Sequence, residues 1–190
     1  MTTVAIVYYS GYGHTKKLAE AVQLGANNAG AQVILYAISQ EGELKESELA
    51  EIGKADAIIY GTPTYMAGPA WQFKKFADAT SKIWFMSQWK DKVAAGFTNS
   101  ASTNGDKGQT LNYLFTFAQQ HGQIWVGLGL LPSNTKAHSS KDINWSGGSI
   151  GVMAISPSDA SPEEAPHNGD IEAAKALGKR VAEITKKLHA

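Results

Sequence analysis

The sequence contains no cysteine among its 190 residues. The chain therefore forms no structural disulfide and no thiolate metal site, and it offers no cysteine nucleophile. Any redox chemistry that it carries out must depend on a bound cofactor. The absence of disulfides is compatible with a reducing compartment, and we expect a cytoplasmic protein.

The chain also lacks an excess of charge of either sign, because 17 Lys and Arg balance 17 Asp and Glu. A neutral molecule has no long-range field that attracts nucleic acid or an anionic membrane. No stretch reaches the roughly 18 apolar residues of a membrane span, and Met1–Tyr9 carries no basic leader. We expect no nucleic-acid partner and no membrane insertion.

Metal-ligand patterns are missing as well. The five histidines form no His-x-x-x-His pair, and no cysteine accompanies them, so we expect no metal site. The segment Gly147–Gly151 matches Gly-x-Ser-x-Gly, the pattern of a hydrolase nucleophile elbow. That elbow needs a strand before it and a helix after it, whereas here a polar loop precedes and a strand follows, so we reject it.

Apolar, β-rich runs alternate with segments of helical period along the chain. The predicted strands are Val4–Tyr9, Gln32–Ile38, Asp56–Tyr60, Val93–Thr98 and Ile124–Leu128. The predicted helices are His14–Asn28, Lys45–Gly53, Pro69–Thr80, Gln109–His121 and Asp170–Leu188. This alternation predicts an α/β fold in one domain over residues 1–190, a three-layer, doubly wound, five-stranded parallel sheet.

Two polar stretches interrupt the alternation. Residues 132–149 are rich in Ser, Asn, Lys and Gly, and residues 156–169 contain three prolines. We interpret both as long loops around a short strand, Gly151–Ile155. Long loops on such a scaffold often serve a binding site or a subunit contact, and the sequence leaves their role open.

Three segments are expected to meet at one edge of the sheet. They are Ser10–Thr15, Gly61–Gly68 and Asn99–Gly108, and each follows a predicted strand. In an open parallel sheet, ligands bind beyond the carboxyl ends of the strands, where the strand order reverses. We therefore interpret the three segments as one binding site, although each alone is also compatible with a solvated loop.

The first segment, SGYGHT, combines two glycines and two hydroxyls with a helix N-terminus, which suits a phosphate. It lacks the Gly-Lys-Ser/Thr ending of a Walker A loop, and Lys16 replaces the third glycine of the dinucleotide pattern. In the second segment, Pro63 stiffens a rim with Tyr65 and Met66 that suits a flat aromatic ring. The third segment consists of small polar residues, so its backbone can approach a ligand closely.

Five motifs follow one another along the chain: VAIVYYSGYGHT (Val4–Thr15), YGTPT (Tyr60–Thr64), Gln72–Trp84, Phe97–Thr110 and a His-Gly pair at His121. In order and spacing they resemble the WrbA-type NAD(P)H:quinone oxidoreductases. The resemblance covers roughly the whole chain. It implies a flavodoxin-like sheet with strand order 2-1-3-4-5, FMN as cofactor, NADH or NADPH as co-substrate and a quinone-like acceptor. It also implies a homodimer or homotetramer whose sites a neighbouring chain completes.

The resemblance further implies roles for individual residues. The expected FMN-binding residues are Ser10, Gly11, Tyr12, Gly13, His14, Thr15, Pro63, Thr64, Tyr65, Asn99, Ser100, Ala101, Ser102, Asn104, Gly105 and His121. The expected catalytic residues are Trp84, His121 and Tyr65. Two alternatives stay open, because a Trp after a helix is more often core and a His before Gly often only marks a helix end.

Two other functions are compatible with the same motifs. One is a one-electron flavodoxin-type carrier, although such carriers are usually acidic and this chain has a formal net charge of +0. The other is a non-enzymatic flavin-binding regulatory module, because a fold does not establish turnover. Tyr65 and Met66 replace an Arg and an aromatic residue that are common in the family, which leaves the nicotinamide and quinone preference open.

Overall fold

The protein is built on one parallel sheet. The computed structural model describes residues 1–189, and the strand order is β2-β1-β3-β5-β6. These strands are β1 (Thr3–Tyr8), β2 (Gln32–Ala37), β3 (Ala57–Tyr65), β5 (Val93–Ser100) and β6 (Ile124–Trp125). Because β5 and β6 are the fourth and fifth predicted strands, the predicted order 2-1-3-4-5 is confirmed.

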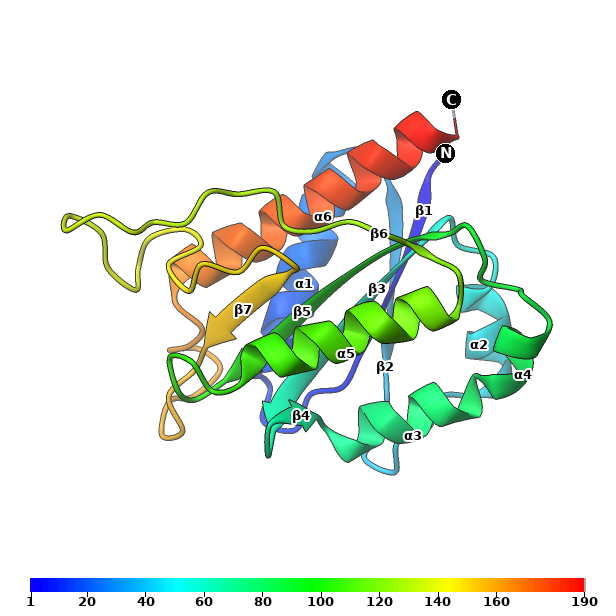
Figure 1. Cartoon of the computed structure of the whole chain (residues 1–190), viewed down its shortest axis with the longest axis horizontal. Coiled ribbons are helices and arrows are strands. Elements are labelled where there is room, and N and C mark those ends of the chain that lie inside the picture. Colours follow the sequence, from blue (N-terminus) through cyan, green and yellow to red (C-terminus); the bar gives the residue numbers. More distant parts are fainter. Residues whose placement is uncertain (190) are drawn as a thin grey trace.

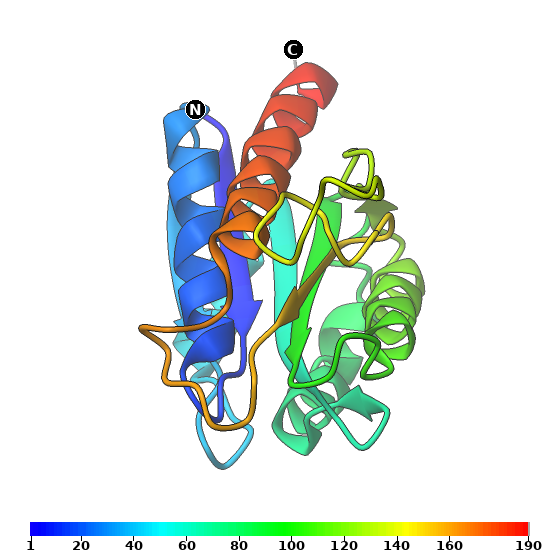
Figure 2. The ribbon, with the colours of Figure 1, turned by 90° about the vertical axis from the view of Figure 1, so that its left-hand side faces the viewer.

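Helices cover both faces of the sheet and give the three predicted layers (Figure 2). One face packs against α1 (His14–Asn28) and α6 (Asn168–Leu188). The other packs against α2 (Glu46–Ile52), α3 (Trp71–Ala79), α4 (Ser81–Phe85) and α5 (Lys107–Gln120). Apolar side chains fill the space on each side, which explains why the central strands are continuous apolar runs rather than alternating ones.

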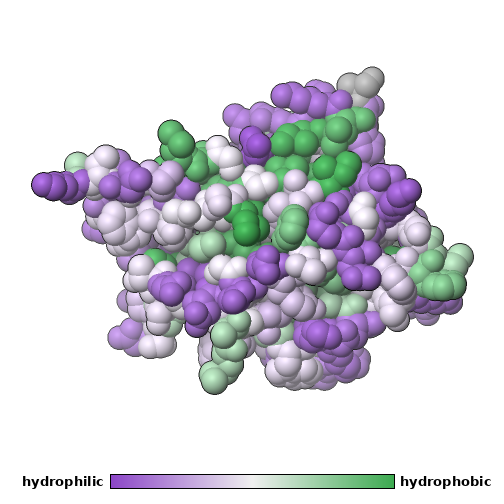
Figure 3. All heavy atoms as spheres, viewed as in Figure 1, coloured by the Kyte–Doolittle hydropathy of each residue, from purple (hydrophilic) through white to green (hydrophobic). Residues whose placement is uncertain are grey.

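The fifth position of the sheet is shared by two strands, which corrects the prediction of one strand over Ile124–Leu128. The short β6 pairs with the start of β5, and β7 (Val152–Ile155) pairs with its last four residues. The chain turns away near Gly129, whose φ of +70° suits glycine. Residues 130–150 then project from the body of the protein (Figure 1), with a hydrophilic tip (Figure 3).

The segment Gly61–Gly68, predicted as a loop, is mostly strand. Pairing with β5 continues as far as Pro63, opposite Asn99, so β3 extends to Tyr65. Met66 and Ala67 both have positive φ and form a tight hairpin to β4 (Gly68–Pro69). The prediction that Pro69 opens a helix is therefore wrong, because Pro69 pairs with β3 and α3 begins two residues later, at Trp71.

Two glycines allow α1 and α6 to pack closely across one face of the sheet. A Cβ atom on Gly25 would lie 1.9 Å from the carbonyl oxygen of Lys175, and one on Gly178 would lie 1.9 Å from that of Val22. Both obstacles are helix backbone, which cannot rotate away as a side chain can. The interhelical spacing therefore depends on these two residues.

We expect Gly178→Ala to lower the free energy of unfolding by about 2–3 kcal/mol, because the added methyl group forces the helices apart. Gly108→Ala is the matched control. Gly108 also lies in a helix, but a Cβ there meets no atom within 4 Å, so higher helix propensity should raise stability by up to about 1 kcal/mol. Urea unfolding measures both changes, and equal effects would contradict the close packing.

Candidate functional site

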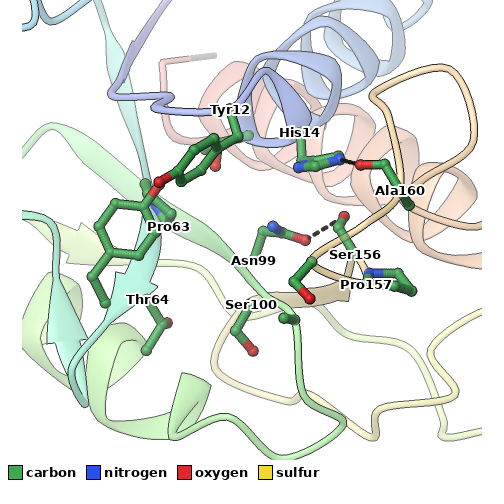
Figure 4. A pocket seen from close by; sticks show the side chains of 13 residues that line it. Tyr12, His14, Pro63, Thr64, Asn99, Ser100, Ser156, Pro157 and Ala160 are labelled. Atoms are coloured by element: carbon green, nitrogen blue, oxygen red, sulfur yellow. Dashed lines mark hydrogen bonds between the residues drawn. The ribbon is translucent and has the colours of Figure 1, made fainter.

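A cavity of about 490 Å³ opens at the carboxyl ends of the central strands. This volume lies within the range of small-molecule sites. Figure 4 shows side chains from four segments around it. The lining residues are Tyr12, His14, Thr15, Pro63, Thr64, Tyr65, Asn99, Ser100, Ala101, Ser156, Pro157, Ser158 and Ala160. Each of the three predicted segments thus contributes to one cavity, together with a fourth segment.

The turn between β1 and α1 presents backbone donors to the cavity. Gly13 is the N-cap residue of α1 and has a φ of 91°. The Ser10 hydroxyl accepts hydrogen bonds from the N–H groups of Gly13 and Lys16, each at 3.1 Å. His14 and Thr15 lie between them in the first helical turn, where N–H groups have no intrahelical acceptor. Both residues line the cavity, so this turn can bind an anion.

Two tyrosines, Tyr12 and Tyr65, line the cavity, and Figure 4 shows the Tyr12 ring close to Pro63. The rings of Tyr12 and Tyr65 meet edge to face, with centroids 6.2 Å apart. A Cβ on Gly11 would lie 2.6 Å from the Tyr65 hydroxyl oxygen, so glycine is needed for this approach. Burial, and then the neighbouring Tyr12, raise the pKa of Tyr65 to about 12, and the phenol stays neutral at physiological pH.

Behind the cavity, three buried threonines link β3, β5 and α5. The Oγ1 atom of Thr64 lies 2.9 Å from that of Thr98 and 2.7 Å from that of Thr110. The Thr98 hydroxyl also donates to the carbonyl oxygen of Thr62 at 2.7 Å. Thr64 is the member that reaches the cavity. These buried hydroxyls therefore form hydrogen bonds within the protein, and the bonds fix the position of Thr64 at the edge of the sheet.

The fourth wall, residues 156–160, was not among the predicted site residues. The hydroxyl of Ser156 donates to Asn99 Oδ1 at 2.8 Å, and its N–H donates to the carbonyl oxygen of Ser100 at 3.0 Å. His14 Nε2 lies 3.0 Å from the carbonyl oxygen of Ala160, and because a carbonyl only accepts, the imidazole donates. One sequence signal existed, since the predicted strand Gly151–Ile155 ends immediately before this wall.

Several predicted binding residues support the cavity without lining it. Ser10 and Gly13 line an adjacent hollow of about 300 Å³ on the other side of the same turn. Gly105 closes the third loop, where a Cβ would lie 2.1 Å from Ser100 Oγ. Ser102 and Asn104 lie in the same loop, are exposed, and do not line the cavity.

Trp84 and His121 lie together, but away from Tyr65. Both line a hollow of about 230 Å³ between α3, α4 and α5, which shares no residue with the larger cavity. Trp84 is 45% exposed, so it is not a core residue. Within a single chain the three predicted catalytic side chains are therefore divided between two hollows.

His121 is buried and uncharged. Its ring packs against Trp89 and Phe117, with centroids 4.7 Å and 5.0 Å away. Thr80 donates its hydroxyl hydrogen to the carbonyl oxygen of Ala77, so His121 Nε2 is the donor in its 2.9 Å contact with Thr80 Oγ1. Burial lowers the pKa of His121 to about 4. The imidazole is therefore neutral at physiological pH, with a hydrogen on Nε2.

Neither metal clusters nor membrane-spanning helices occur in the part of the chain that the structure describes. Residues 1–189 contain no group of three or more His, Asp or Glu side chains placed to hold a metal ion. None of the helices in this range is both long and apolar enough to cross a membrane. No Lys or Arg lines the large cavity, so an anion there would meet N–H groups and hydroxyls rather than a cationic side chain.

Comparison with known proteins assigns the chain to a family. The family model of NADPH-dependent FMN reductases matches residues 9–128, which include the first helical turn and the ends of β3 and β5. The chain belongs to the NADPH-dependent FMN reductase family. The resemblance to flavodoxin-like, WrbA-type proteins is confirmed by the relatives and solved structures that match.

Members of this wider group carry more than one functional name. Flavodoxin FldP of Pseudomonas aeruginosa is 50% identical over 190 residues, with both chains covered completely. An NAD(P)H dehydrogenase (quinone) of Paracoccus denitrificans is 31% identical, over 97% of this chain and 94% of that protein. The crystal structure of a WrbA-like flavodoxin from Agrobacterium tumefaciens has a TM-score of 0.78 and 48% identity, and the match covers 98% of this chain and 99% of that one.

For this member of the family, we expect the contribution of His121 to stability to fall as the pH drops from about 6.5 to 4. The unfolded chain takes up a proton on His121 in this range, whereas the native imidazole, with its pKa lowered to about 4, does not. The full effect is about 3 kcal/mol. His121→Gln removes it, so the difference in unfolding free energy between wild type and variant should shrink towards acidic pH.

Denaturant unfolding at several pH values measures this difference. Asp170, whose pKa burial raises to about 6, acts in the opposite direction within the same pH range. Its contribution is common to wild type and variant and cancels in the subtraction. A difference that does not change with pH would contradict the buried, neutral His121.

Proposed function

We propose that the large cavity binds FMN. The observation that carries this proposal is that a helix N-terminus, a rim with two tyrosines and a polar loop face one cavity of suitable volume. The turn Ser10–Thr15 would hold the phosphate through backbone N–H groups. Pro63, Thr64 and Tyr65 would contact the ring, and Asn99–Gly105 would serve its edge and the ribityl chain.

The chain's own residues suit that ligand. Proteins bind phosphate at helix N-termini through N–H groups and the helix dipole, without needing a cationic side chain. Tyr12 and Tyr65 offer an apolar surface with polar edges, which suits a flat heteroaromatic ring. Bound FMN supplies hydride acceptance and release, and the protein supplies position and exclusion of water.

We further propose an NAD(P)H:quinone oxidoreductase that passes two electrons to a quinone-like acceptor. The family name and the relatives named NAD(P)H dehydrogenase (quinone) support this activity. A one-electron carrier is the second candidate, favoured by the name of the Pseudomonas relative at 50% identity. The net charge of +0 supports the enzyme, because carriers that dock to basic partners are usually acidic.

Steady-state turnover distinguishes these functions. We expect the FMN-loaded protein to oxidise NADH or NADPH when benzoquinone or a naphthoquinone is added, at a rate of about 1 s⁻¹ or more. The control is free FMN at the same concentration. If the protein turns over no faster than free FMN with every combination of nicotinamide and quinone, a carrier or a regulatory module is favoured. Reductive titration then separates those two, because a carrier accepts electrons one at a time.

Phosphate recognition can be tested with Thr15→Ala. We expect FMN to bind about 10- to 100-fold more weakly, because a hydrogen bond to a charged group is lost, while riboflavin affinity stays the same. Thr116→Ala, an exposed threonine in α5, is the matched control. Fluorescence titration measures each affinity. Equal losses for FMN and riboflavin would show that this turn does not serve the phosphate.

We also propose that Trp84 and His121 act on the site of a neighbouring chain in a homodimer or homotetramer. Within one chain they lie outside the large cavity. The α4 segment exposes three adjacent large apolar side chains, with Trp84 45%, Phe85 77% and Met86 59% exposed. Contiguous exposed apolar surface of this kind is typical of protein interfaces.

We expect Trp84→Ala to lower quinone kcat/KM by about tenfold through loss of an aromatic contact, with FMN affinity unchanged. Trp71→Ala is the control, since Trp71 is 59% exposed on the neighbouring α3. Light scattering should give a multiple of 20.3 kDa for the wild type. A monomer with full activity would exclude a site shared between chains.

A further inference from the structure

Lys107, the first residue of α5, is fully buried, with 0% of its surface exposed. Lysine is almost never fully buried, because its charge loses hydration in the protein interior. Lys107 lies within the predicted segment Asn99–Gly108, but it is not among the individual residues predicted to bind FMN, and it does not line the large cavity. Its position therefore needs a separate explanation.

The ammonium group is satisfied by one short stretch of chain. Lys107 Nζ donates to Ser100 Oγ at 2.8 Å, to the carbonyl oxygen of Ser102 at 2.7 Å and to that of Thr103 at 3.0 Å. An ammonium has three hydrogens, so all of them are used. The third loop of the site is thus wrapped around a single cation.

No carboxylate within residues 1–189 forms an ion pair with this cation. The acid that influences it is Asp170, itself buried, whose Oδ2 accepts from the N–H of Ile155 at 2.9 Å. Burial lowers the pKa of Lys107 to about 8, so the amine is mostly charged at neutral pH. Carbonyl and hydroxyl dipoles contact the ammonium directly, and Asp170 favours its charge without forming an ion pair with it.

One of the three acceptors of Lys107, Ser100, belongs to the cavity wall, and the other two lie in the loop that follows it. The carbonyl oxygen of Ser100 accepts from the N–H of Ser156, which follows the paired strand β7 and forms the neighbouring wall. Gly105 packs against Ser100 so closely that no Cβ fits there. The loop therefore has little freedom to move without breaking the bonds to the ammonium.

We propose that Lys107 is a positioning residue of the flavin site, which holds the wall around Ser100 in the shape that receives the ring and whose charge favours the reduced cofactor. This proposal rests on the proposed binding of FMN. Reduction adds negative charge to the flavin, and a fixed cation in a low-dielectric interior stabilises such charge without reorganising. The hydrogen bonds of Lys107 act on the affinity for FMN, and its positive charge acts on the redox potential of the bound FMN.

Two variants separate these effects. Lys107→Met removes both the donors and the charge, whereas Lys107→Gln keeps two N–H donors without the charge. Lys92→Met is the matched control, since Lys92 Nζ is partly buried, donates to the carbonyl oxygen of Ala55 and lies at the opposite end of β5. The readouts are FMN and riboflavin affinity by fluorescence titration, the midpoint potential of the bound flavin, and the melting temperature.

We expect Lys107→Met to weaken FMN and riboflavin equally, by about tenfold, because the wall serves the ring end of both ligands. Both Lys107 variants should lower the two-electron midpoint potential by about 30 mV, which corresponds to a tenfold loss of preference for the reduced flavin. Lys92→Met should change neither quantity.

The outcomes distinguish this proposal from the proposed function. If wild-type protein does not bind FMN, both proposals are wrong. If it binds FMN and the Lys107 variants have lower melting temperatures but wild-type affinity and potential, Lys107 has only a structural role. If Lys107→Met does not fold, the midpoint potential of the flavin bound to Lys107→Gln is the deciding measurement. A potential equal to that of the wild type overturns the proposal.

Discussion

Strands β1, β3 and β5 lie side by side and run in the same direction, and this parallel pairing creates the candidate site. It brings the turn after Tyr8, the end of β3 and the end of β5 to one edge of the sheet. The pairing of β3 with β5 continues to Pro63 and Asn99, further than the apolar runs extend. Because pairing fixes the register of both strands, the ring side and the polar loop of the cavity cannot shift independently.

Hydrogen bonds between segments far apart in the sequence hold the remaining wall of the cavity in place. The wall at residues 156–160 is bonded to Asn99, Ser100 and His14, which precede it by more than 50 residues in the sequence. Buried polar groups in this region are matched mainly with one another, as the three-threonine network and the Lys107 cluster illustrate. Such matching is required where water is excluded, and it gives the cavity a defined shape before any ligand binds.

The cavity and the hollow of Trp84 and His121 differ in chemistry as well as place. The cavity presents N–H groups, hydroxyls and tyrosines, with no Lys or Arg in its lining. The smaller hollow combines an exposed tryptophan with a buried neutral histidine. A homo-oligomer would allow the two surfaces to face each other across an interface, whereas a single chain keeps them apart.

The sequence by itself determined the three layers and most of the cavity lining, because apolar runs, helical periods and a glycine turn before a helix are local patterns. The strand order followed from the family resemblance of the motifs and not from these patterns. The patterns misplaced the start of α3 and the length of the fifth strand, since the hairpin at Met66 and the second strand β7 depend on pairing with β3 and β5. Only the tertiary structure decided that residues 156–160 wall the cavity, that Lys107 is buried beneath its edge and that His121 lies outside it. These positions depend on packing between segments far apart in the chain, and the end of the predicted strand Gly151–Ile155 was the one local signal for any of them.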